Sequence, residues 1–375
     1  MFESMRGSSP PSHVFHLLIL CTCIAAGPSR PFVQAQASTE HGFSPEPEAE
    51  LQTAIALTRR GLFEDAIPHF LAVQGRVAEE YVATFNLALC YVGTGRFDRA
   101  VPLLIALRDR QRETAEVNNL LAQAYLGEQQ PQLALVAFKR AVALAPKNEK
   151  LYLFAADAYM DHQYYAAGLN AVELGLLYLP DSPRLHYHRA VFLCLLDEFD
   201  LAKTDFDAVG KLAPESDISY LATAQKHLFA GAIPEAIRTA REAIKKDHAD
   251  FILLAILGES LIRSGAAPGD KEFAEAQAVL EKSVAAHPNY PSSQIALGKL
   301  YLMNNRLDEA ILHLEFGRRL EPLNPSAYSN LAAAYRRRGD LEQAQNIVTA
   351  LDKLNQQQAA RIRDGSGERE GHNKQ

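Results

Sequence analysis

Tryptophan is absent from this chain of 375 residues, and only four methionines and four cysteines occur. Cys21 and Cys23 lie in an apolar stretch near the N-terminus, which leaves Cys90 and Cys194 for the rest of the chain. Two cysteines in so long a chain exclude the disulfide framework that holds small secreted domains together. We expect both to be small residues of the core.

The chain also lacks the short motifs that most readily indicate an enzyme. No CxxC pair, HExxH segment, GxxxxGK[ST] loop or GxSxG turn occurs in the sequence. His186 and His188 are two residues apart, so on a helix they point away from each other and do not predict a metal pair. We therefore expect no catalytic residues, no metal site and no cofactor.

Charge excludes a further class of function. The formal net charge is -7, and charged residues make up 22% of the chain. Such a composition is typical of a globular protein, and its acidic balance disfavours binding to the phosphates of nucleic acids.

The N-terminal segment resembles an export signal. Residues 14–27 form an apolar run, VFHLLILCTCIAAG, and small-residue patterns place a cleavage site after Ala35 or Ala37. We predict a signal peptide over residues 1–37, a polar linker over residues 38–46, and a periplasmic or extracellular location if the source is bacterial. An uncleaved membrane anchor and a cytosolic leader are the alternatives.

Small residues recur along the rest of the chain in two columns, with a period of 34 residues except where one unit is longer. Every position in the two columns is alanine or glycine: Ala54, Ala66, Ala88, Ala100, Ala122, Ala134, Ala156, Gly168, Ala190, Ala202, Ala224, Ala236, Gly258, Ala276, Gly298, Ala310, Ala332 and Ala344. Two helices approach closely where small side chains let the ridge of one enter the groove of the other. The pattern therefore predicts repeated pairs of packed helices.

Turn residues separate these predicted helices. Glycine follows the first helix of several units, at Gly61, Gly95, Gly231 and Gly339, where it can end a helix in the left-handed conformation. Proline closes five units, at Pro146, Pro180, Pro214, Pro288 and Pro322. Because proline cannot continue a helix, each unit is predicted to be one helical hairpin.

A 34-residue unit with small residues at positions 8 and 20, an aromatic at position 11 and proline at position 32 resembles the tetratricopeptide repeat. The fourth position departs from the family, which often has tryptophan where this chain has Tyr152, Tyr220 and Tyr328. The resemblance implies an all-α fold, a right-handed α-solenoid or superhelix of about nine antiparallel helix hairpins. The predicted units span 47–80, 81–114, 115–148, 149–182, 183–216, 217–250, 251–290, 291–324 and 325–358.

Two segments depart from the regular period. The seventh unit is longer by six residues, which we place in its hairpin turn around Ala266–Lys271. After Leu351 the last helix is expected to run on to about Arg363, so that residues 359–375 comprise a helix end and a disordered polar tail.

The resemblance also implies that the first helices line a concave groove. The residues expected there are Phe85, Asn86, Leu89, Asn119, Gln123, Leu153, Asp157, Arg184, Tyr187, His188, Leu221 and Gln225. Apolar side chains with scattered amides suit an extended or helical peptide. The lysine, asparagine and arginine set with which some members grip a C-terminal carboxylate does not occur at matching positions.

We therefore expect a non-enzymatic scaffold or adaptor that binds a protein or peptide segment of unknown identity, without nucleic acid. An accessory subunit of an envelope or glycan-assembly enzyme complex is the alternative. An RNA-binding helical repeat protein is less favoured, because such arrays have a period of 35 residues and need a basic groove.

Overall fold

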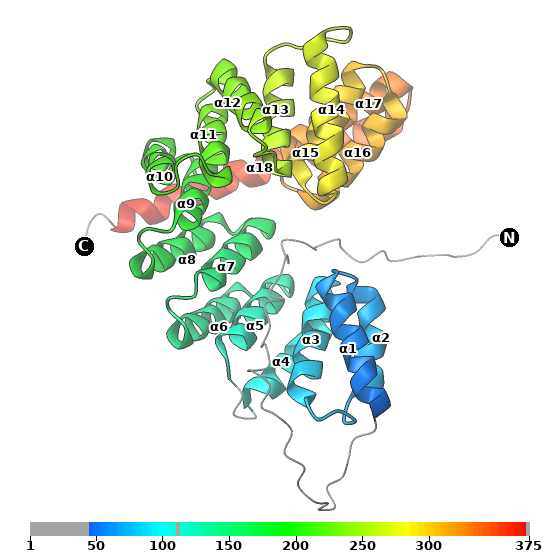
Figure 1. The fold of residues 1–375 in the computed structure, drawn as a ribbon. Coiled ribbons are helices and arrows are strands. Elements are labelled where there is room, and N and C mark those ends of the chain that lie inside the picture. The colour runs from blue at the N-terminus through cyan, green and yellow to red at the C-terminus, as the bar shows by residue number, and fades with distance from the viewer. Residues whose placement is uncertain (1–44, 110–112, 373–375) are drawn as a thin grey trace, which may run out of the picture. The chain divides into compact units, whose positions relative to one another are not determined.

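The computed structural model describes residues 45–109 and 113–372, and describes side chains as far as residue 356. The predicted signal peptide lies outside these residues. The described residues form eighteen helices and no strand (Figure 1). The helices are α1 (Pro45–Arg59), α2 (Phe63–Val73), α3 (Glu80–Gly93), α4 (Phe97–Asp109), α5 (Ala115–Gly127), α6 (Pro131–Leu144), α7 (Glu149–Asp161), α8 (Tyr165–Tyr178), α9 (Pro183–Leu195), α10 (Phe199–Leu212), α11 (Asp217–Phe229), α12 (Ile233–Lys245), α13 (Phe251–Arg263), α14 (Lys271–Ala286), α15 (Pro291–Met303), α16 (Leu307–Leu320), α17 (Pro325–Arg338) and α18 (Leu341–His372).

The helices fall into two compact units, which the sequence did not predict. Unit 1 ends at Asp197 and contains α1–α9, and unit 2 begins at Glu198 and contains α10–α18. The boundary therefore lies within the predicted fifth repeat, 183–216.

Within each unit, helices pack as hairpins and the hairpins stack. In unit 1, α1 packs on α2, α3 on α4, α5 on α6 and α7 on α8. The first helices also contact one another in the order α1, α3, α5, α7 and α9. Unit 2 repeats this arrangement, with hairpins α11–α12, α13–α14, α15–α16 and α17–α18 and a row of first helices α11, α13, α15 and α17.

The two columns of small residues lie where these helices meet. All eighteen alanine and glycine positions predicted from the period are buried. Large side chains beside them fill the core. Among these are Phe70, Phe138, Tyr159 and Phe192, each at most 2% exposed. The packing role predicted for the small columns is confirmed.

The turn inside each hairpin has at least one residue in the left-handed conformation. The four predicted glycine caps adopt it, with φ of 73° at Gly61, 72° at Gly95, 71° at Gly231 and 95° at Gly339. Gly265 adopts it in the longer seventh unit, with φ of 94°. Three hairpins lack glycine at the equivalent place and have Gln129, Gln163 or Asn305 in this conformation, and Asp197 adopts it between α9 and α10.

In several units the side chain at the fourth position contacts the carbonyl oxygen of the proline that closes the unit before it. Tyr152 Oη donates a hydrogen bond to the carbonyl oxygen of Pro146 at 2.8 Å, and Tyr328 Oη donates one to that of Pro322 at 2.9 Å. Gln294 Nε2 makes the same contact with Pro288 at 2.6 Å. Tyrosine and glutamine thus supply the donor at a position where the family often has tryptophan.

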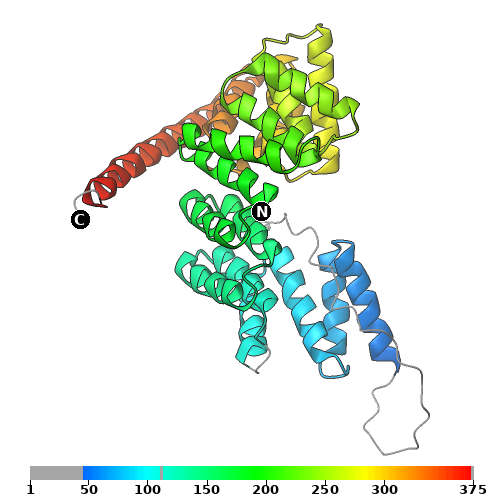
Figure 2. The same cartoon turned by 60° about the vertical axis from the view of Figure 1, so that its left-hand side comes forward.

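The extra residues of the seventh unit lie between Arg263, where α13 ends, and Lys271, where α14 begins. The C-terminal prediction differs from the structure, because α18 continues to His372 instead of ending near Arg363 (Figure 2). Glycines at 365, 367 and 371 favoured an earlier end, but no proline follows Pro325 to stop the helix. None of the described helices is both long and apolar enough to span a lipid bilayer.

Candidate functional site

The residues predicted to line a groove lie on the first helices of successive hairpins. In unit 1 they come from four helices that contact their neighbours in order, namely α3, α5, α7 and α9. Leu221 and Gln225 lie on α11 in unit 2. We call the side chains of Phe85, Asn119, Gln123, Leu153, Asp157 and Asp161 the first-helix face of unit 1.

Burial divides the predicted residues into two groups. Leu89, Asn119, Tyr187 and Leu221 are 1–7% exposed, so they pack between helices and present little surface. The partly or fully exposed group comprises Phe85, Asn86, Gln123, Leu153, Asp157, Arg184, His188 and Gln225. Only this second group is accessible to a ligand without movement of the helices.

Phe85 and Leu153 give this face its apolar character. Phe85 is half-buried and stacks on Tyr81, with ring centroids 6.2 Å apart. Leu153 occupies the equivalent place two repeat periods later and is also half-buried. Asn86 contributes less, because its Nδ2 donates to the carbonyl oxygen of Val82 at 2.8 Å within its own helix.

Two carboxylates lie one helical turn apart on α7. Asp157 has a side chain 24% exposed, and Asp161 is exposed. Burial nevertheless raises the pKa of Asp157 well above its ordinary value, with a smaller contribution from the charge of Asp161. Burial also raises the pKa of Asp161 to about 7.

His188 of α9 lies beside Asp157. Its Nε2 lies 4.0 Å from Oδ1 of Asp157, and its ring meets that of Tyr187 edge to face at 5.8 Å. His188 therefore belongs with Asp157. His186 instead lies with its Nε2 2.9 Å from the carbonyl oxygen of Pro180, so the two histidines have separate environments.

Asn119 of α5 is buried without hydrogen bonds to its amide. The residue is 1% exposed, and neither Oδ1 nor Nδ2 has a partner among the described residues. Leaving a buried amide unpaired costs about 1–3 kcal/mol. Such a group needs an explanation, and its place between the columns of Phe85 and Leu153 puts it on the first-helix face.

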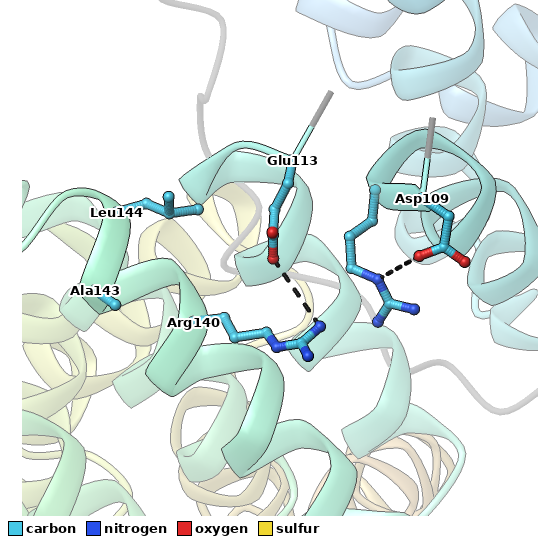
Figure 3. A pocket seen from close by; sticks show the side chains of 6 residues that line it. Asp109, Glu113, Arg140, Ala143 and Leu144 are labelled. Atoms are coloured by element: carbon cyan, nitrogen blue, oxygen red, sulfur yellow. Dashed lines mark hydrogen bonds and ion pairs between the residues drawn. The ribbon is translucent and has the colours of Figure 1, made fainter. Parts of the chain in front are cut away.

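A hollow of about 330 Å³ lies elsewhere in unit 1 and was not predicted (Figure 3). Its lining consists of Arg108, Asp109, Glu113, Arg140, Ala143 and Leu144. Arg108 Nε donates to Asp109 Oδ1 at 2.9 Å, and Arg140 Nη1 lies 4.0 Å from Glu113 Oε1.

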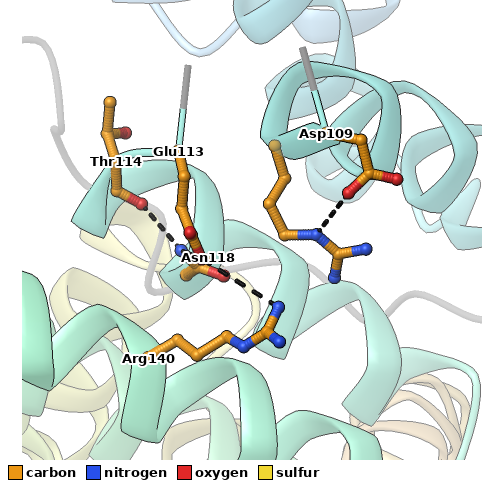
Figure 4. A network of polar contacts seen from close by, with 6 residues as sticks. Asp109, Glu113, Thr114, Asn118 and Arg140 are labelled. Atoms are coloured by element: carbon orange, nitrogen blue, oxygen red, sulfur yellow. Dashed lines mark hydrogen bonds and ion pairs between the residues drawn. The ribbon is translucent and has the colours of Figure 1, made fainter. Parts of the chain in front are cut away.

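A polar network continues behind the hollow (Figure 4). Asn118 Nδ2 donates to Glu113 Oε1 at 3.0 Å and to the carbonyl oxygen of Thr114 at 3.1 Å. Two arginines and two carboxylates therefore balance in charge around the hollow. Because no excess charge remains to select a charged ligand, we interpret the polar contacts around the hollow as a structural network.

The sequence did not single out Asp161. The residue follows Asp157 by four positions, and residues so spaced on a helix share a face, so this spacing could have found it. The buried and unpaired state of Asn119 had no indication in the sequence, because it depends on how tightly α5 and α7 approach.

The described residues contain neither a metal-binding cluster nor a disulfide. Among residues 45–109 and 113–372, no group of three or more histidine, cysteine, aspartate or glutamate side chains is arranged to hold a metal ion. Neither Cys90 nor Cys194 forms a disulfide among the described residues, and burial raises the pKa of Cys194 to about 12. Such a thiol stays protonated and unreactive at neutral pH.

Family models agree with the repeat found in the sequence. One tetratricopeptide repeat model matches residues 51–100, 85–149 and 298–346, and another matches residues 269–315. A crystal structure of a tetratricopeptide repeat protein from Parabacteroides merdae is similar, with a TM-score of 0.50 and 18% identity over 68% of this chain and 98% of that chain. The fold is an all-α solenoid of tetratricopeptide repeats.

Two further solved structures that resemble the chain have lower TM-scores. A chain of the APC/C hetero-tetramer Cut9–Hcn1 gives 0.47 at 15% identity, over 77% of this chain and 56% of that chain. A thermophilic tetratricopeptide repeat protein of Thermus thermophilus gives 0.41 at 22% identity, over 49% of this chain and 98% of that chain. No curated protein matches the chain in sequence.

Proposed function

We propose that this chain is a non-enzymatic scaffold that binds a protein or peptide segment along the first-helix face of unit 1. Solenoids of tetratricopeptide repeats typically bind protein or peptide partners and are typically non-catalytic. The observation that carries the proposal is the row of half-buried side chains on adjacent first helices, from Phe85 on α3 to Leu153 and Asp157 on α7.

The proposal assigns the chain to the secretory or envelope compartment. Its support is the apolar run at residues 14–27 with the small-residue patterns that follow it. Anchoring by an uncleaved segment is the alternative. Fractionation of source cells, with N-terminal sequencing of the mature chain, distinguishes the two: a new N-terminus after Ala35 or Ala37 supports export, and an intact Met1 in the membrane fraction supports the anchor.

The binding surface can be tested with a photo-crosslinking amino acid placed at single positions of the full chain. Leu153 is the test position. Leu177 is the matched control, because it is 79% exposed on α8, the second helix of the same hairpin. Crosslinked partners are identified by mass spectrometry after irradiation of intact source cells.

The proposal predicts a small set of proteins crosslinked from position 153 and absent from position 177. Circular dichroism of both variants confirms that each is folded. The same partners captured equally from both positions, or from position 177 alone, would show that the first-helix face is not the binding surface.

A further inference from the structure

The first helices of unit 2 carry the opposite charge to those of unit 1. In unit 1, α3, α5 and α7 contain five acidic residues and one lysine. In unit 2, α13, α15 and α17 contain one acidic residue, Glu259, and five basic residues. The whole chain has a formal net charge of -7, so the excess of cations is a local property of these helices.

Two of these five cations have no anionic partner. Lys299 of α15 is half-buried and Arg336 of α17 is exposed, and neither side chain forms an ion pair or a hydrogen bond among the described residues. The remaining three each have a partner: Glu259 for Arg263, the carbonyl oxygen of Leu302 for Arg337, and Asp308 and Asp340 for Arg338. Lys299 and Arg336 therefore keep their charges available to a ligand.

Lys299 and Arg336 lie near the same level of neighbouring helices. The helices α15 and α17 contact each other, and Arg337 Nη1 of α17 donates to the carbonyl oxygen of Leu302 on α15 at 3.0 Å. Lys299 lies about one turn before Leu302, and Arg336 directly precedes Arg337. Because packed helices are about 8–10 Å apart, these two long side chains can both reach a carboxylate placed between them.

Lys299 also marks the accessible side of α15. From Ser293 to Leu302 it is the only residue of that helix that is not buried. Ala333 occupies the equivalent place on α17, one repeat period later, and is half-buried. Its small side chain covers less of Lys299 than a large residue would. We call Lys299, Ala333 and Arg336 the basic patch of unit 2.

An acidic polypeptide fits this patch better than a uniform polyanion does. Carboxylate side chains form strong charge-assisted hydrogen bonds with ammonium and guanidinium groups. Glu259 occupies the place on α13 that is equivalent to Lys299, and α13 also contacts α15. A continuous run of phosphates would be repelled there, whereas a polypeptide can place a carboxylate at the patch and a neutral or basic residue near Glu259.

We propose that the basic patch of unit 2 binds an acidic segment of a polypeptide partner. Side-chain carboxylates of aspartate or glutamate lie against Lys299 and Arg336. The inference goes beyond the proposed function, because it gives unit 2 a second binding surface with its own class of ligand. The two surfaces share no residue, so either can fail without the other.

The test uses the full chain and a displayed library of random 16-residue peptides, each fused to its carrier through its C-terminus. Enriched peptides are synthesised with amidated C-termini, so that only side-chain carboxylates are present, and their affinity is measured by titration calorimetry at low and high salt. The test variant is Lys299→Gln with Arg336→Gln. The control is Arg238→Gln with Lys282→Gln, which removes the same charges from exposed positions on the second helices α12 and α14.

The proposal predicts that enriched peptides carry two or more aspartate or glutamate residues. The test variant should bind them at least about tenfold more weakly and with a smaller salt dependence, because the lost interactions are ionic. Arg336→Gln alone, at an exposed position, should already weaken binding. The control variant should bind as the unchanged chain does, and so should Leu153→Glu, which alters unit 1.

Three results would each overturn the inference. The first is a set of enriched peptides that is neutral or basic. The second is a library that yields no peptide whose affinity differs between the test and control variants, with both shown to be folded by circular dichroism. The third is a single-stranded DNA of 20 nucleotides that displaces the peptides with equal affinity. None of these results bears on the first-helix face of unit 1, which crosslinking from position 153 tests separately.

Discussion

Gly258 of α13 faces Leu280 of α14 so closely that a methyl group on Gly258 would lie 2.4 Å from Cγ of Leu280. Gly258 belongs to the first column of small residues, and Leu280 is the large residue that packs against it. We predict that Gly258→Ala destabilises unit 2 by about 1–2 kcal/mol, because overpacking costs more than alanine's better helix propensity gains. Urea unfolding followed by circular dichroism measures the change.

Gly210 of α10 provides the control for that substitution. A methyl group there would meet only Oγ of Ser219, at 3.8 Å, which is ordinary contact. Gly210→Ala should therefore stabilise unit 2, by up to about 1 kcal/mol. Equal effects of the two substitutions would show that close packing at Gly258 is not what excludes alanine.

Gln163 holds a left-handed backbone conformation, with φ of 58°, where other hairpins have glycine. A side chain in this region contacts the following carbonyl group unfavourably, and glycine avoids that contact. We predict that Gln163→Gly stabilises unit 1 by about 0.5–1 kcal/mol, after allowing for the entropy that glycine loses on folding. Thermal unfolding of the full chain measures this shift.

The reverse substitution checks the same explanation. Gly61 has φ of 73°, and a Cβ atom there would meet no atom within 4 Å, so only backbone strain opposes Gly61→Gln. We expect a loss of similar size. A neutral outcome for both substitutions would contradict the assigned conformation of this turn.

Tyr328 links two repeats through its hydrogen bond to Pro322. Tyr328→Phe keeps the ring and removes the donor, so the carbonyl oxygen of Pro322 loses this partner. The expected cost is about 1 kcal/mol, measured by urea unfolding. Tyr220→Phe is the control, since Tyr220 Oη accepts from the exposed side chain of Lys246 and its loss should change the stability little.

Asp161 makes the stability of unit 1 depend on pH in a particular direction. Its pKa in the folded chain, about 7, lies above its ordinary value of 3.8, so ionisation favours the unfolded chain. The resulting destabilisation is absent well below pH 3.8, grows as the pH rises, and is complete above about pH 7. Asp161→Asn should therefore stabilise unit 1 at pH 8 and stabilise it much less at pH 4.5.

We expect the gain at pH 8 to be on the order of 1 kcal/mol, because solvent contact screens this exposed side chain. Urea midpoints at the two pH values give the comparison. Asp200→Asn is the control, since hydrogen bonding to Lys203 lowers the pKa of Asp200 and gives a small effect of the opposite sign. A larger gain for Asp161→Asn at pH 4.5 than at pH 8 would contradict the raised pKa.

The hairpin architecture was predictable because it depends on short-range patterns. The small columns, from Ala54 to Ala344, require only that two helices approach closely, and glycine at 61 and 95 supplies a left-handed turn in any context. Gln129 and Gln163 show the limit of this reasoning. Both adopt a left-handed conformation that glutamine itself disfavours.

The candidate site was predictable in part. Phe85, Leu153 and Asp157 lie on first helices of neighbouring hairpins, as the period implies, and the spacing of four residues could have added Asp161. The burial of Leu89 and Tyr187, and the unpaired amide of Asn119, depend on the distances between helices. Sequence periodicity does not contain those distances.

The claim that the first-helix face of unit 1 binds a polypeptide is tested most directly by one affinity measurement. A partner segment captured from position 153 is titrated against the unchanged full chain and against the variant Leu153→Glu, with the fold of both checked by circular dichroism. The account predicts at least a tenfold loss of affinity, about 1.4 kcal/mol or more. Unchanged affinity in a folded variant would contradict it.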